Sequence, residues 1–215
     1  MRAVLADIAE TNRTDMPLDI WPRLTNLGDS SFLLPAALLV ALFVSRGVEG
    51  ARRAKHWLLI FGACGLSVLL SKVAYEAWGV SIRSINFRGF SGHTALAAAL
   101  FPVAGFFVCD GSDRAVRLGG AAVGMALAVL VGISRVVVGA HSASEASSGL
   151  VLGLLASGWY LQARWPTIPA RPEDSRGTRL MLGMGVVFAY SWLAGRAPTH
   201  EWAVILAEGL RSLSH

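Results

Sequence analysis

The feature that most constrains this chain is a series of uncharged apolar runs that recurs along its length. They occupy residues 30–45, 57–71, 94–109, 118–134, 146–162 and 180–195. Each is close to the roughly 17 residues of the shortest membrane-crossing helices. The helices of a soluble bundle show a polar stripe every three to four residues, and these runs do not. Only 15% of the chain is charged. The sequence therefore predicts an all-α, polytopic membrane protein with six transmembrane helices.

The segments on either side of this region have a different character. We expect residues 1–26 to form an interfacial N-terminal segment, residues 27–195 the six-helix transmembrane domain, and residues 196–215 an amphipathic C-terminal tail. Charged residues interrupt both end segments, and apolar residues recur there at helical spacing. These apolar residues are Val4, Leu5, Ile8, Trp202, Ile205, Leu206 and Leu213.

The distribution of basic residues predicts the orientation in the membrane. The net charge is +5, and the loops after the first, third and fifth runs hold many of the basic residues. These are Arg46, Arg52, Arg53, Lys55, Arg114, Arg117, Arg164, Arg171, Arg176 and Arg179. Because loops retained in the cytoplasm are enriched in Lys and Arg, we expect both termini and the loops after the second and fourth runs to face outward. Topology accounts for the positive charge, so we expect no nucleic-acid partner.

Small polar and ionisable residues gather at the run ends that face outward. In chain order they are Lys72, Ser91, Gly92, His93, Ser134, Arg135, His141 and Glu145. Ionisable side chains at membrane depth are costly and are functional candidates by default. Cations, imidazoles and a carboxylate beside a helix N-terminus suit the binding and transfer of an oxyanion. The sequence predicts one such site at the outer membrane boundary.

Two stretches carry most of this prediction. Ser91 and Gly92 open the third helix, where free backbone N–H groups attract an anion; the alternative is an ordinary serine cap beside an interfacial His93. His141 and Glu145 are four residues apart, so a helix brings them together, and the carboxylate can fix the tautomer of the ring. The alternatives are a capped loop with a snorkelling arginine at position 135 and, for Lys72, a plain ion pair with Glu76.

Together these residues resemble the three-part signature of the membrane type 2 phosphatidic acid phosphatases, the PAP2 superfamily. That family's pattern is K-x6-R-P, then P-S-G-H, then S-R-x5-H-x3-D. Here the order is a lysine, Ser-Gly-His, and Ser-Arg-x5-His-x3-Glu, between Lys72 and Glu145. The six predicted spans agree with a PAP2-like bundle.

The chain departs from the family pattern at three positions. Phe90 replaces the proline before Ser-Gly-His, and Glu145 stands where the family has aspartate. Gly79 occupies the position of the first-motif arginine, and no Arg-Pro follows. Arg88 and Arg83 are the candidates for the missing guanidinium. We favour Arg88 because it lies three residues before Ser91.

The resemblance implies a metal-independent hydrolysis through a phosphohistidine. His141 would be the nucleophile, Glu145 would orient its ring, and His93 would protonate the leaving oxygen. The phosphate oxygens would be held by Lys72, Arg88, Ser91, Gly92, Ser134 and Arg135. It implies no cofactor and no metal ligands.

A site at the membrane boundary favours a lipid phosphate as substrate. Phosphatidic acid, an isoprenyl pyrophosphate, phosphatidylglycerol phosphate and a lipid A phosphate all qualify. We expect a multi-pass protein of the cytoplasmic membrane with its active site on the non-cytoplasmic face; the sequence does not indicate an oligomeric state. A lipid phosphotransferase that uses the same site, and a non-catalytic protein that binds or transports anionic lipids, are the alternatives.

Overall fold

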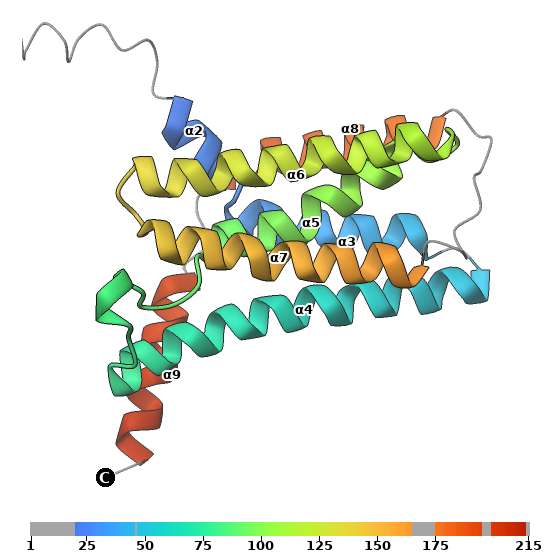
Figure 1. Cartoon of the computed structure of the whole chain (residues 1–215). Coiled ribbons are helices and arrows are strands. Elements are labelled where there is room, and N and C mark those ends of the chain that lie inside the picture. Colours follow the sequence, from blue (N-terminus) through green and yellow to red (C-terminus); the bar gives the residue numbers. More distant parts are fainter. Residues whose placement is uncertain (1–19, 46, 165–174, 195–198, 214–215) are drawn as a thin grey trace, which may run out of the picture.

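The computed structural model describes residues 20–45, 47–164, 175–194 and 199–213, and within them the chain is helical apart from its turns and loops (Figure 1). The α-helices are α2 (Ile20–Asn26), α3 (Ser30–Val44), α4 (Gly47–Trp78), α5 (Gly92–Val108), α6 (Arg114–Val137), α7 (Ala143–Arg164), α8 (Ser175–Ala194) and α9 (Thr199–Leu213). A short 3₁₀ turn, η1 (Arg83–Ile85), lies between α4 and α5. Each of the six apolar runs corresponds to one helix, α3 to α8, so the all-α prediction is confirmed for the described part of the chain.

The number of membrane spans is supported only in part. By length and composition, two of the described helices can cross a membrane, over Val48–Trp78 in α4 and Arg114–Val137 in α6. Helices α2 and α3 meet at a 45° bend and qualify as a third span if they are taken together. Helix α5 is apolar but has 17 residues. The full count of six therefore stays a prediction. Residues 1–19 of the predicted interfacial segment lie outside the described residues.

Helix α5 forms the centre of the bundle, between α6 and α7. Most of its side chains are buried, and small residues let the neighbouring backbones approach closely. A Cβ added to Gly120 of α6 would collide with the backbone of Gly105 in α5, and one added to Gly153 of α7 would collide with that of Ala95. This close packing fixes the position of α5 relative to α6 and α7.

Helices α3 to α8 alternate in direction. As a result, the C-terminal ends of α4 and α6 and the N-terminal ends of α5 and α7 lie together, at the left in Figure 1. Helix α9 crosses this same end against α4, where Arg211 Nε donates to the carbonyl oxygen of Ala77 at 2.9 Å. It buries Ala203 while Ile205 and Leu206 are exposed. That arrangement suits the predicted amphipathic tail, whose membrane contact stays a prediction.

Candidate active site

A pocket of about 470 Å³ opens at the end where these four helix termini meet. Six of the residues singled out in the sequence line it: Lys72, Arg88, His93, Arg135, His141 and Glu145. Tyr75, Glu76, Gly89, Phe90 and Ala140 complete its wall. Two imidazoles, three cations and two carboxylates therefore share one cavity, although they come from α4, α5, α6, α7 and two connecting loops.

His141 and Glu145 form a direct pair. His141 Nδ1 lies 2.9 Å from Glu145 Oε2. An ionised carboxylate only accepts hydrogen bonds, so Nδ1 carries the proton and Nε2 keeps its lone pair. The neutral ring in this tautomer has a nucleophilic Nε2 that does not face its own carboxylate.

Glu145 is held by further hydrogen bonds from the backbone. The N–H of Ser142 donates to Oε2 at 3.1 Å, and the N–H of Arg88 donates to Oε1 at 2.9 Å. The carbonyl oxygen of Glu145 accepts from the N–H of Ser91 at 3.1 Å. One residue at the start of α7 thus joins the nucleophile candidate, the loop that carries Arg88, and the N-terminus of α5.

The surroundings of His141 favour its uncharged form. Burial lowers the pKa of its imidazole, and the nearby cations Arg135 and Lys72 act in the same direction. The hydrogen bond and negative charge of Glu145 raise the pKa but do not reverse the net shift. These surroundings therefore favour the neutral ring, the form in which a histidine can act as a nucleophile.

The loop before α5 brings Arg88 to the pocket. Gly89 has φ +147°, and a Cβ there would meet Ser71 Oγ at 3.2 Å, so only glycine lets the loop pass α4 this closely. The next residue, Phe90, donates its N–H to Ser71 Oγ at 3.1 Å. The Arg88 guanidinium lies 5.8 Å from the centre of the Tyr75 ring. Arg83 instead lines a neighbouring pocket, to which Arg88 also contributes.

Lys72 reaches the pocket without the partner considered for it. Among the described residues no ion pair joins Lys72 to Glu76, so the plain interfacial pair is not formed. Lys72 lies within the electrostatic influence of Arg135, Glu145 and Glu76. The described residues also contain no group of three or more His, Cys, Asp or Glu that could hold a metal ion.

Three predicted phosphate ligands do not line the pocket. Ser91 and Ser134 are completely buried. Ser91 Oγ accepts from Thr94 Oγ1 at 3.0 Å, whereas Ser134 Oγ donates to the carbonyl oxygen of Val131 at 2.7 Å. Gly92 is the first residue of α5 and lies against Val68 of α4. The hydroxyl groups of both serines thus form hydrogen bonds with neighbouring protein groups.

Sequence reasoning missed two residues at the corner between α2 and α3. Asp29 is buried, and its Oδ2 lies 3.7 Å from His93 Nε2. Thr25 Oγ1 lies 2.9 Å from Ser134 Oγ, which ties α2 to α6. The only sequence signal for Asp29 is its position as an acidic N-cap just before an apolar run, and that signal does not indicate which side chain it meets.

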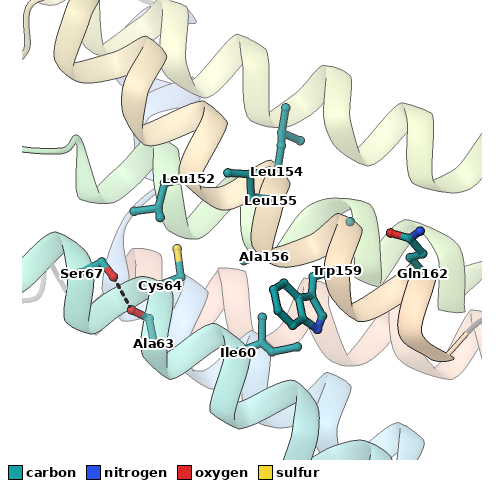
Figure 2. Close-up of a pocket in the computed structure, with 11 residues that line it drawn as sticks. Ile60, Ala63, Cys64, Ser67, Leu152, Leu154, Leu155, Ala156, Trp159 and Gln162 are labelled. Carbon is teal, nitrogen blue, oxygen red and sulfur yellow. Dashed lines mark hydrogen bonds between the residues drawn. The ribbon is translucent and has the colours of Figure 1, made fainter.

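A separate apolar groove of about 830 Å³ lies between α4 and α7. Figure 2 shows Ile60, Cys64 and Ser67 of α4 on one side, with Leu152, Leu155 and Trp159 of α7 on the other. Ser67 precedes Lys72 by five residues, about 7.5 Å along a helix, and Leu152 follows Glu145 by seven, about 10 Å. The same two helices therefore carry polar groups at one end and the groove nearer their middle.

Comparisons with known proteins agree with the motifs. The family model of the PAP2 superfamily matches residues 73–169. A Klebsiella pneumoniae protein named "Uncharacterized 22.5 kDa protein in cps region" is 39% identical over 185 residues, covering 84% of this chain and 87% of the relative. Phosphatidylglycerophosphatase B of Bacillus subtilis (strain 168) is 32% identical over 151 residues, covering 64% of this chain and 70% of the relative. No solved structure matches the chain significantly.

Proposed function

Because the chain belongs to the PAP2 superfamily of phosphatases and is related to phosphatidylglycerophosphatase B, we propose that it is a membrane enzyme that hydrolyses a lipid phosphate or pyrophosphate. The observation that carries the proposal is the 2.9 Å pairing of His141 with Glu145 in a pocket that also holds His93 and three cationic side chains. A nucleophile, its orienting carboxylate, a second imidazole and positive charge are the parts that phosphoryl transfer through histidine needs.

In the first step, Nε2 of His141 attacks phosphorus. The bond between phosphorus and the leaving oxygen breaks, His93 gives that oxygen a proton, and a phosphohistidine remains. Lys72, Arg88 and Arg135 neutralise the nonbridging oxygens, and their charge has most effect in a site that excludes water. Glu145 stabilises the positive charge that develops on the attacking ring.

In the second step, water attacks the phosphorus of the phosphohistidine. His93, now neutral, accepts a proton from this water while the bond between phosphorus and nitrogen breaks, and inorganic phosphate leaves. The pocket cations supply the charge that a metal ion supplies in other phosphatases, so we propose that no divalent ion is required. We further propose that Ser134 has a structural role at the site, because its hydroxyl is hydrogen-bonded to the Thr25 hydroxyl and to the Val131 carbonyl oxygen.

The groove between α4 and α7 supports a lipid substrate. Its lining is mainly apolar and includes Leu152, Leu155 and Trp159, and it lies on the same two helices as Lys72 and Glu145. A hydrocarbon chain in the groove can therefore belong to the molecule whose phosphate lies in the pocket. Among lipid phosphates, phosphatidylglycerol phosphate is suggested by the name of the Bacillus subtilis relative, and the other candidates remain phosphatidic acid, isoprenyl pyrophosphates and lipid A phosphates.

The location of the charges supports an outward-facing site in the cytoplasmic membrane. Many basic residues lie at the helix ends opposite the pocket, and we propose that these ends face the cytoplasm. Among the described residues they are Arg52, Arg53, Lys55, Arg114, Arg117, Arg164, Arg176 and Arg179. The substrate then reaches the pocket from the non-cytoplasmic leaflet.

The decisive experiment is phosphate release by the purified protein in detergent, with EDTA present, from the lipid phosphates named above. We expect release that survives the chelator and disappears in His141→Ala. Unchanged release in that variant would eliminate the assigned nucleophile. Binding of the lipids without turnover would favour an anionic-lipid binding or transport protein. Transfer of the phosphoryl group to a second lipid instead of water would identify a phosphotransferase.

A further inference from the structure

We propose that Asp29 is a positioning residue for His93, and that its charge favours the protonated ring that a general acid needs; this inference rests on the proposed function. The residue lies at the corner between α2 and α3, outside the motif segment from Lys72 to Glu145. The active site would then contain two imidazole–carboxylate pairs with different tasks.

The corner between α2 and α3 is packed directly on His93. A Cβ added to Gly28 would lie 2.9 Å from His93 Cβ and 2.7 Å from Val131 Cγ1, so only glycine allows this approach. Before Gly28 in the chain, Thr25 Oγ1 contacts Ser134 Oγ at 2.9 Å. Directly after Gly28, Asp29 Oδ2 lies 3.7 Å from His93 Nε2. These contacts hold the carboxylate beside the ring.

Asp29 is itself held in place. Its Oδ1 accepts from the N–H of Ser31 at 2.8 Å, which caps α3. The side chain is 8% exposed and that of His93 is 23% exposed. Oδ2 is the oxygen nearer the ring, so one carboxylate both caps a helix and faces an imidazole.

The two imidazoles need opposite charge states in the same cavity. His141 attacks as a neutral ring, whereas His93 must hold a proton to give to the leaving oxygen. Burial opposes protonation of both rings, and the positive charge of Arg135 and Lys72 acts in the same direction. For His93 the neighbouring carboxylate is Asp29, whose negative charge favours the imidazolium form. The nitrogen that does not face Asp29 is then available to the substrate.

The test separates acid catalysis from structural support by varying the leaving group. The variant is Asp29→Asn, because asparagine caps helices about as well as aspartate but carries no charge. The matched control is Asp113→Asn, since Asp113 caps α6 at the opposite end of the bundle through the N–H of Val116 at 2.9 Å. The two probes are dodecyl phosphate, whose alkoxide needs a proton to leave, and a dodecyl-substituted nitrophenyl phosphate, whose phenolate does not.

We expect Asp29→Asn to lower kcat/KM for dodecyl phosphate by about tenfold or more and for the nitrophenyl probe by less than about threefold. His93→Gln should show the same selective loss, and Asp113→Asn should change neither value. The ratio kcat/KM includes steps only up to departure of the leaving group, so slow dephosphorylation does not mask the effect. Thermal unfolding in detergent checks that each variant is folded.

An equal loss for both probes, or no loss for either, would overturn the proposal for Asp29. A selective loss in His93→Gln without one in Asp29→Asn would also overturn it, while leaving the assignment of His93 intact. Failure of the proposed function is a different result, because the unaltered protein would then release phosphate from neither probe nor from any lipid phosphate.

Discussion

His141 Nδ1 and Glu145 Oε2 lie 2.9 Å apart at the start of α7, and the same carboxylate accepts from the backbone N–H groups of Ser142 and Arg88. The pair therefore fixes both the protonation pattern of the His141 ring and the position of a neighbouring loop. It selects the tautomer with a free Nε2, and it fastens the Arg88 loop beside the attacking ring.

The first prediction concerns the covalent intermediate. Rapid quenching of the reaction with ³²P-labelled lipid phosphate should trap label on the protein that is stable in base and labile in acid, as phosphohistidine is. His141→Gln should abolish this labelling and lower turnover by at least about 10⁴-fold. His56→Gln, at a histidine near the opposite end of α4, should label normally. Labelling that persists in His141→Gln would place the nucleophile elsewhere.

The second prediction concerns Glu145. Glu145→Gln should lower kcat/KM by about 10²- to 10⁴-fold, because the amide can present an N–H to the ring and no longer stabilises positive charge on it. Glu145→Asp should lose less activity, since the carboxylate is retained and only its reach is shortened. Steady-state kinetics on protein with an unchanged unfolding temperature provide the measurement. A loss of less than about threefold in Glu145→Gln would contradict the orienting role.

The third prediction is a pH dependence. His141 must be neutral to attack, so activity falls as pH decreases through its pKa. Because burial, Arg135 and Lys72 lower that pKa, the acidic limb of kcat/KM should lie below about 6.5, the ordinary value for histidine.

The same causes predict how variants move this limb. Arg135→Gln removes a charge that lowers the pKa and should shift the limb to higher pH, whereas Glu145→Gln should shift it to lower pH. Arg83→Gln, in the neighbouring pocket, is the control and should leave it in place. A limb that is unmoved in both active-site variants would show that another group controls it.

The fourth prediction concerns the apolar groove. A Cβ at Gly158 would meet nothing within 4 Å, and the residue lines the groove. Gly158→Phe should therefore fill the groove without disturbing the fold, and lower kcat/KM for long-chain lipid phosphates by about tenfold relative to short-chain ones. Gly185→Phe introduces the same ring at an equally open position on α8 and should not change this preference. Equal effects of Gly158→Phe on all chain lengths would exclude the groove as the tail site.

The sequence predicted the features that depend on nearby residues. The long apolar runs predicted membrane helices, because a backbone surrounded by lipid hydrocarbon has no water to bond and must pair its own N–H and C=O groups. The four-residue spacing of His141 and Glu145 predicted their contact on the assumption that one helix carries both residues. The contact is formed, but His141 lies in the loop just before α7 and Glu145 in its first turn. Gly79 stands where the family has an arginine, and the sequence favoured Arg88 as its replacement because Arg88 lies close to Ser91 in the chain. Arg88 does line the pocket. Its role toward substrate, like those of the other site residues, stays a prediction.

The tertiary structure decided what depends on packing between distant segments. The burial of Ser91 and Ser134, and the contact of Asp29 with His93, follow from how α2, α3, α5 and α6 fit together. Glycines with almost no space for a Cβ, such as Gly28 before α3 and Gly120 of α6, govern that fit. A sequence motif specifies which side chains are near one another along a helix, but contacts between helices depend on close approach of whole backbones, which local periodicity does not encode.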